Sequence, residues 1–168
     1  MSSPRRARDP YARVLDWLAR RDRSEREIRD KLRDWGVEIE ETGAILAKLI
    51  DKGLVDDRAF AQKLASYHER HDPVGPPRLL RKLRQRGVAS DLASEAVEGL
   101  RDLDLQRELA LRLVLRRLPS LLPLAPEARV RRLSGYLARR GFAPSLVREL
   151  CHPLLREDLS LEDYEHDP

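Results

Sequence analysis

Cysteine, aromatic residues and long apolar runs are all scarce in this sequence, and each scarcity excludes a class of protein. Its 168 residues include one cysteine, Cys151, so no disulfide framework can form within the chain, as is typical of a reducing compartment. No stretch is long and apolar enough to span a membrane, and the Arg-rich N-terminus lacks the apolar core of a signal peptide. We therefore expect a cytoplasmic protein without a membrane partner.

The residue clusters that catalysis or metal binding needs are missing as well. The sequence has no Gly-rich phosphate loop and no Walker-type lysine. His68 and His71 are three residues apart, but no further ligand follows at a recognisable spacing, and we interpret the pair as part of a solvated face. Cys151 has no matching histidine motif and is expected to fill a small buried space. We predict no catalytic residue, no metal and no cofactor, and hence a protein that is not an enzyme.

Charged and helix-forming residues are abundant by contrast. Charged residues make up 37% of the chain and aromatic residues only 5%, and no segment alternates polar and apolar residues with a period of two. This composition predicts an all-α fold. The net charge of +4 is compatible with an anionic partner such as nucleic acid, and equally with ordinary solvated helix faces.

Three glycines, Gly36, Gly87 and Gly141, mark an internal repeat with intervals of 51 and 54 residues. Each glycine ends a predicted helix and is followed by an apolar residue. At positions −8, −4, +9 and +13 from the glycine, all three copies are apolar: Ile28, Leu79 and Leu133; Leu32, Leu83 and Leu137; Ile45, Ala96 and Leu150; Leu49, Leu100 and Leu154. The repeat predicts three tandem three-helix modules in an elongated array that is able to curve.

The helix start and stop signals divide the chain into five segments. We expect a disordered N-terminus, three modules and a flexible acidic tail, over residues 1–9, 10–54 (module 1), 55–104 (module 2), 105–155 (module 3) and 156–168. The sequence from Ser24 to Glu27 predicts a capping box at the second helix of module 1. Because proline disrupts a helix interior, the segment from Pro119 to Pro126 is predicted to be a connector inside module 3.

The middle helices of modules 2 and 3 are predicted to have basic faces. Residues 78–86 and 128–147 contain no acidic residue, whereas basic and acidic residues alternate in the corresponding helix of module 1. We predict that the surface for an anionic partner consists of Arg78, Arg81, Lys82, Arg86, Arg129, Arg132, Arg139 and Arg140. Guanidinium groups suit bidentate contact with phosphate, and without a base-reading motif the contact with DNA would not depend on its sequence. The alternative is that these residues only keep the helices soluble.

Two further features have a simple and a functional interpretation. Tyr136 lies among the arginines of module 3 and is either partly packed or available to stack on a base. The tail from residue 156 to residue 168 contains six acidic residues and either increases solubility or competes with an acidic ligand for the basic helices.

Four segments of the sequence resemble the RecX family, whose members regulate the RecA recombinase. They are residues 14–25 (VLDWLARRDRSE) with Lys31, Leu32 and Gly36; residues 54–61 (LVDDRAFA); Gly75-Pro76 with the basic helix up to Gly87-Val88; and residues 136–142 (YLARRGF). They occur in the expected order over nearly the whole chain. The connector with Pro119 and the acidic tail have no counterpart in that pattern.

The resemblance implies an all-α protein that binds along the groove of the RecA filament on single-stranded DNA. It implies inhibition of ATP hydrolysis and strand exchange by RecA, and modulation of the SOS response. The expected partners are the RecA filament and, through phosphates without sequence specificity, single-stranded DNA, with the protein acting as a monomer. The alternative is a sequence-independent nucleic-acid-binding helical protein without a dedicated protein partner.

Overall fold

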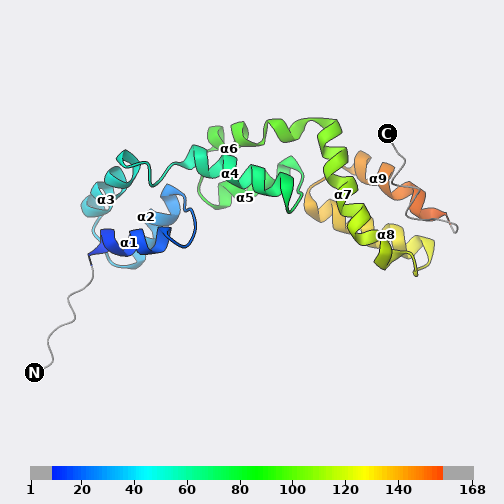
Figure 1. Cartoon of the computed structure of the whole chain (residues 1–168), viewed down its shortest axis with the longest axis horizontal. Helices are drawn as coiled ribbons and strands as arrows, with labels where there is room; N and C mark the ends of the chain where they lie inside the picture. Colours follow the sequence, from blue (N-terminus) through cyan, green and yellow to red (C-terminus); the bar gives the residue numbers. More distant parts are fainter. Residues whose placement is uncertain (1–8, 157–168) are drawn as a thin grey trace, which may run out of the picture. The chain divides into compact units, whose positions relative to one another are not determined.

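The computed structural model describes residues 9–156, and this part of the chain is all-α, as predicted (Figure 1). The described residues form nine α-helices and two 3-10 turns, with no β-strand among them. The helices are α1 (Pro10–Leu18), α2 (Glu25–Asp34), α3 (Ile39–Asp51), α4 (Asp57–Arg70), α5 (Pro76–Gln85), α6 (Ser90–Val97), α7 (Leu103–Leu121), α8 (Pro126–Arg140) and α9 (Pro144–Cys151). The 3-10 turns are η1 (Gly99–Arg101) and η2 (His152–Leu155). The predictions for residues 1–8 and 157–168 concern parts of the chain outside this range.

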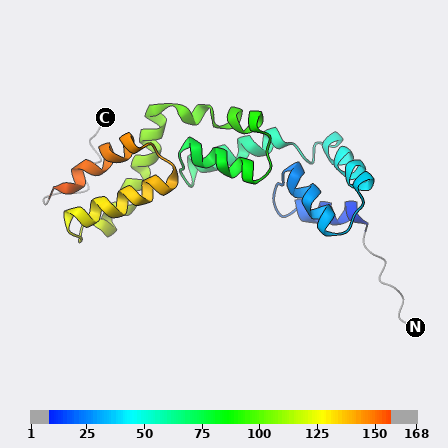
Figure 2. The same ribbon diagram turned by 180° about the vertical axis from the view of Figure 1, so that it is seen from behind.

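The helices are distributed over two compact units. Among the described residues, unit 1 consists of residues up to 63 and of 83–93, and unit 2 consists of 64–82 and of the residues from 94 onward. Helices α1 to α3 belong to unit 1. Helices α7, α8 and α9 belong to unit 2, and these three pack against one another (Figure 2). Helices α4, α5 and α6 contribute residues to both units. The module boundaries stay a prediction from the sequence.

The three repeat glycines end α2, α5 and α8 in the same way. Their φ angles are 75°, 85° and 86°, in the left-handed region that glycine adopts without steric cost. In each copy the residue after the glycine donates its N–H to a carbonyl in the last turn of the helix, and this bond satisfies a helix end. The three bonds are Val37 to Leu32 (3.1 Å), Val88 to Leu83 (3.1 Å) and Phe142 to Leu137 (3.4 Å).

The apolar positions of the repeat form the cores. Eleven of the twelve are at most 6% exposed, and Ala96 is half-buried. One buried cluster joins α1, α2 and α3 of module 1 to Val55, the first residue of module 2. Its other members are Val14, Ile28, Leu32, Ile45, Leu46 and Leu49. Full burial of one such side chain contributes about 1.5–3 kcal/mol, so short helices that would be marginal alone are stabilised by packing.

The predicted capping box is confirmed, and a second cap is seen at the start of α1. The Ser24 hydroxyl accepts the N–H of Glu27 at 3.2 Å, and the Glu27 carboxylate accepts the N–H of Ser24 at 3.1 Å. Asp9 caps α1 by accepting the N–H of Tyr11, and Pro10 occupies the first helical position. The capping box fixes the start of α2 and the positions of Ser24 and Glu27.

The predicted connector from Pro119 to Pro126 is wrong in its first half, because α7 continues through Pro119 to Leu121. Proline inside a helix costs about 3 kcal/mol. Leu118 and Leu121 on the same turn are 0% and 5% exposed, and burying two leucines contributes about 3–6 kcal/mol. Tertiary packing therefore outweighs the local penalty, and only residues 122–125 connect α7 to α8.

Candidate nucleic-acid interface

The eight basic residues predicted to bind an anionic partner occupy three different environments. The exposed ones are Arg81, Arg132 and Arg139; the half-buried ones are Arg78, Lys82, Arg86 and Arg140; the buried one is Arg129. The eight basic residues therefore do not form the single exposed surface that we predicted from the sequence.

Arg129 is the largest departure from the prediction. Its side chain is 8% exposed, and its guanidinium donates hydrogen bonds to the carbonyls of Leu122 at 2.7 Å, Leu124 at 2.8 Å and Arg156 at 3.0 Å. These bonds hold the α7–α8 connector and the end of η2 against the start of α8. The placement of Arg129 on an exposed face is therefore wrong, because its N–H groups are hydrogen-bonded to main-chain oxygens inside unit 2.

Arg86 takes part in a contact within unit 1 that we call the first junction, formed by Ser24, Arg26 and Glu27 at the start of α2 and by Arg86 and Gly87 after α5. Arg86 Nε lies 2.8 Å from Glu27 Oε1, and its Nη2 donates to Glu27 Oε2 at 3.0 Å. The Ser24 hydroxyl donates to the carbonyl of Arg86. A side chain at Gly87 would overlap Arg26, so the backbone after α5 lies close to the start of α2.

Arg78 and Arg140 take part in the second junction, which lies within unit 2. It consists of Asp72 and Gly75 in the loop before α5, Arg78 in the first turn of α5, and Arg140 and Gly141 at the end of α8. Arg78 donates to the carbonyl of Arg139. Arg140 pairs with the Asp72 carboxylate and donates to the carbonyl of Pro73 at 3.2 Å. The N–H of Gly75 donates to the carbonyl of Arg140 at 2.9 Å. A Cβ at Gly75 would overlap the backbone of Gly141, so glycine is required there.

Lys82 contacts a buried histidine beside the second junction. His68 is 4% exposed; its Nδ1 lies 2.8 Å from the carbonyl of Asp72 and its Nε2 lies 3.1 Å from Lys82 Nζ. A carbonyl only accepts, so Nδ1 carries the proton and Nε2 accepts from the ammonium group. Burial lowers the pKa of His68, and the neighbouring Lys82 charge lowers it further. Both ring nitrogens are therefore used inside the fold, and the prediction that His68 belongs to a solvated face is wrong.

The remaining arginines of module 3 line a cleft between α7 and α8 in unit 2, which we call the basic cleft. Its volume is about 430 Å³, and its lining residues are Arg117, Ser120, Leu121, Arg131, Arg132, Leu133, Tyr136 and Arg139. Four guanidinium groups and no carboxylate line this space. Arg132 and Arg139 were predicted from the sequence, whereas Arg117 and Arg131 were missed. Arg131 lies in the acid-free stretch 128–147 and could have been found there; Arg117 comes from another helix and needed the tertiary structure.

Tyr136 is half-buried at the basic cleft and orders two arginines around its ring. The guanidinium carbons of Arg117 and Arg140 lie 4.6 Å and 5.2 Å from the ring centre, within the range of a cation–π interaction. Within residues 9–156, no ion pair joins Arg117, Arg131, Arg132 or Arg139 to a carboxylate. These charges are therefore available to an anion from outside the described fold.

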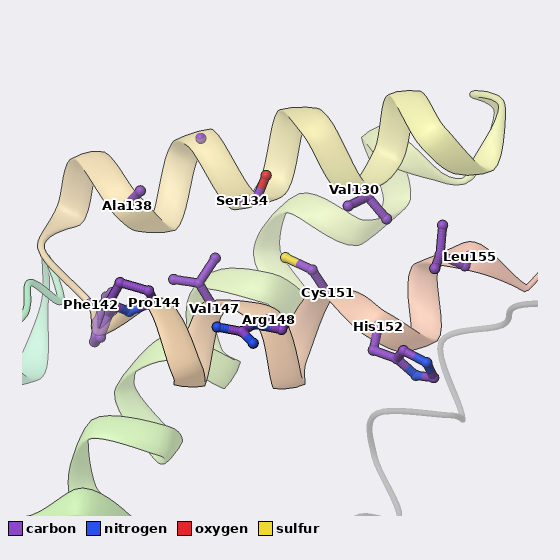
Figure 3. A pocket seen from close by; sticks show the side chains of 11 residues that line it. Val130, Ser134, Ala138, Phe142, Pro144, Val147, Arg148, Cys151, His152 and Leu155 are labelled. Carbon is purple, nitrogen blue, oxygen red and sulfur yellow. The ribbon is translucent and has the colours of Figure 1, made fainter.

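A second, apolar groove of about 510 Å³ lies between α8, α9 and η2 (Figure 3). Figure 3 shows Val147 and Cys151 of α9 pointing toward α8, where Val130 and Ala138 lie. Cys151 is 3% exposed, and burial raises the pKa of its thiol to about 11. The thiol therefore stays protonated near neutral pH, which agrees with its predicted role as a buried filler.

The described residues contain neither a cluster of metal ligands nor a helix that could cross a membrane. In residues 9–156, no three or more His, Cys, Asp or Glu side chains are grouped so that they could hold a metal ion. No helix of that range combines the length and the apolar character that crossing a bilayer requires.

Comparison with known proteins shows similarity along the whole described chain. The models of the first, second and third three-helix domains of RecX match residues 11–49, 56–97 and 104–151. The regulatory protein RecX of Thermobifida fusca is 38% identical over 165 residues, which are 95% of this chain and 85% of the relative. The protein of the same name from Chlorobaculum tepidum is 32% identical over 150 residues, 89% of this chain and 91% of the relative.

Solved structures agree with the fold. The crystal structure of RecX from Lactobacillus salivarius superposes with a TM-score of 0.71 at 22% identity, covering 86% of this chain and 94% of that one. A second crystal structure of a regulatory protein RecX gives a TM-score of 0.72 at 29% identity and covers 85% of this chain and 71% of that one. The similarity extends over three three-helix domains in both sequence and architecture.

Proposed function

The chain belongs to the RecX family of regulatory proteins, and from this premise we propose that it binds the RecA filament on single-stranded DNA and inhibits it. Bound in the filament groove, it would inhibit ATP hydrolysis and strand exchange by RecA and thereby modulate the SOS response. It would act by contact and not by catalysis, as a cytoplasmic monomer. The observation that supports a DNA contact is the basic cleft, whose four guanidinium groups have no carboxylate partner within residues 9–156.

The chemistry of the basic cleft suits phosphate. Guanidinium groups donate in pairs to phosphate oxygens, and that of Arg117 lies over the ring of Tyr136 at the cleft. The cleft presents no arrangement that would read the edges of bases, so we expect contacts to the backbone of any sequence. Each phosphate contact that is lost should reduce the salt dependence of binding to single strands by about 0.7 in logarithmic slope.

The competing proposal is a nucleic-acid-binding protein without a protein partner, which the basic cleft alone would also support. The two proposals differ in what they predict at one salt concentration. A general binder has the same affinity for bare DNA and for DNA coated with RecA. A filament regulator prefers the coated DNA, because contacts to the protein add to those to phosphate.

The test is the ATPase rate of RecA on single-stranded DNA, titrated with this protein below one copy per RecA subunit. We expect inhibition at these low ratios, and weaker inhibition by the double variant Arg131→Glu/Arg132→Glu. The matched control is Arg20→Glu/Arg70→Glu, which makes the same charge change at exposed positions outside the basic cleft. If the wild type binds bare DNA without inhibiting RecA, the competing proposal is correct. If both double variants weaken inhibition equally, the cleft assignment is wrong.

A further inference from the structure

The two junctions join the same positions of the internal repeat. Counted from the repeat glycine, position −1 of one module contacts position −12 of the module before it. In the first junction the Ser24 hydroxyl donates to the carbonyl of Arg86, and in the second the N–H of Gly75 donates to the carbonyl of Arg140 at 2.9 Å. In each junction the end of the middle helix of one module therefore contacts the start of the middle helix of the module before it.

The side chain at position −1 reinforces this contact by an ion pair. Arg86 pairs with Glu27 in the first turn of α2, and Arg140 pairs with Asp72 in the loop before α5. The two acids occupy different positions of the repeat, but each lies near the start of the earlier middle helix. The side chains of the two arginines are 28% and 24% exposed, so solvent screens these pairs less than it screens an open surface pair. The Arg140 hydrogen bond and charge also outweigh the effect of burial and lower the pKa of Asp72.

The two ends of the repeat lack these features. Position −1 of module 1, the first of the three modules, is Trp35, and the guanidinium of Arg13 lies 3.8 Å from its ring centre. Position −12 of module 3 is Arg129, whose side chain fills the space with its own bonds to three carbonyls. A small residue at −12 and an arginine at −1 thus occur only at the copies of these positions that take part in a junction. The copies at the same place in a helix but outside a junction carry other residue types.

We propose that Arg86 and Arg140 are positioning residues, which hold successive modules at a fixed spacing so that they engage successive subunits of the filament together. This proposal rests on the proposed function. Linked sites bind more tightly than single ones only if their geometry permits simultaneous contact, and a preorganised linkage loses less entropy on binding. The arginines would therefore affect binding to the filament more than binding to a bare strand, which the basic cleft can contact alone.

The second junction permits the sharper test, because Glu27 of the first also belongs to the capping box. Asp72→Arg opposes two positive charges, and Asp72→Arg/Arg140→Asp restores an ion pair with reversed direction. The matched control is Glu69→Arg, which makes the same charge change at an exposed side chain three residues away. Module spacing is read from the distance distribution between spin labels at Arg81→Cys and Ser145→Cys, both exposed and both in unit 2, in a Cys151→Ala background.

We expect Asp72→Arg to broaden this distribution and to raise the concentration for half-inhibition of RecA by about tenfold, a partial loss of a gain from linked binding that can reach about 100-fold or more. Affinity for a bare oligonucleotide should stay within about twofold, since the basic cleft supplies the phosphate contacts. The reversed pair should restore both the narrow distribution and most of the inhibition, and Glu69→Arg should behave like the wild type.

The contrary outcomes are distinct. A narrow distribution in Asp72→Arg would show that Arg140 does not position the modules. A broad distribution with unchanged inhibition would remove the link between spacing and function. If the wild type binds DNA without inhibiting RecA, the proposed function fails, and the distance distributions alone then decide whether Arg140 holds the spacing.

Discussion

The first and second junctions join the same positions of the repeat through different chemistry. Ser24 reaches the carbonyl of Arg86 with a side-chain hydroxyl, whereas Gly75 reaches the carbonyl of Arg140 with its own N–H and leaves no room for a side chain. The first junction is therefore a contact made by side chains, and the second is a contact of backbone on backbone. The contact between positions −12 and −1 is thus present in both junctions although the residue at −12 differs. Ser24 and Gly75 should therefore differ in their tolerance to mutation.

A second contrast, between Arg129 and Arg132 on α8, concerns the end of the array. The two residues are three positions apart, yet one is buried with three carbonyl partners and the other is exposed at the basic cleft. Helical periodicity alone placed both on one broad basic face. The burial of Arg129 occurs at the repeat position where each junction places a small residue.

The largest effect is expected for Arg129→Ala, which should destabilise unit 2 by about 3 kcal/mol or more. Three carbonyls would lose hydrogen bonds from a charged donor, each of which contributes about 1.5–3 kcal/mol when counted alone. Urea unfolding measures the change, with Arg132→Ala as the control, which should stay within about 0.5 kcal/mol. Equal effects of the two variants would contradict the structural role of Arg129.

Gly75→Ala should destabilise the second junction by about 1–3 kcal/mol, the usual cost of inserting a methyl group into filled space. Gly43→Ala is the matched control, because its Cβ would meet nothing within 4 Å in the middle of α3. Since alanine favours a helix, the control should stabilise the protein by about 0.5–1 kcal/mol. Thermal unfolding of both variants gives the comparison, and a neutral Gly75→Ala would mean that the backbones do not meet so closely in solution.

Ser24→Ala should destabilise the first junction by about 1 kcal/mol, since it removes the N-cap of α2 together with the bond to the Arg86 carbonyl. The effect is smaller than that of Gly75→Ala because alanine fits without overlap. Ser145→Ala, at an exposed serine, should change the free energy of unfolding little. An effect of Ser24→Ala above that of Gly75→Ala would reverse the ranking of the two junctions.

The smallest effect is a pH dependence that belongs to the second junction. The folded-state pKa of His68 is below its usual value of 6.5, so its contribution to stability is present above pH 6.5 and is lost as the pH falls toward the folded pKa. If the folded form stays neutral, the loss between pH 7 and pH 6 is about 0.7 kcal/mol. Urea unfolding at both pH values should detect it, and His68→Gln should abolish it. Persistence of the slope in that variant would assign it to another group.

Much of the fold followed from the sequence, for reasons that are local. Gly36, Gly87 and Gly141 predicted three helix ends because few other residues adopt a positive φ, and Ser24 with Glu27 predicted a capping box. The apolar positions of the repeat predicted the cores, with Ala96 as the half-buried exception. The prediction that the helix ends before Pro119 was wrong, because the free-energy cost of proline in a helix was outweighed by the burial of leucines on the same turn.

The candidate site was less accessible to sequence reasoning. Arg132 and Arg139 were found, because a stretch without acidic residues leaves its positive charge uncompensated. Arg117 was missed because it reaches the basic cleft from α7. Arg86 and Arg140 have the same sequence signal as the cleft arginines, and their partners Glu27 and Asp72 lie 59 and 68 residues away in the chain.

By itself, the sequence determined the all-α class, the three helix ends and the apolar positions, since these depend on backbone conformations and side-chain periodicity within a few residues. Only the tertiary structure decided which positive charges are free. A guanidinium is equally charged beside a carboxylate, beneath three carbonyls or in an open cleft. What it can bind depends on partners that folding brings from distant parts of the chain.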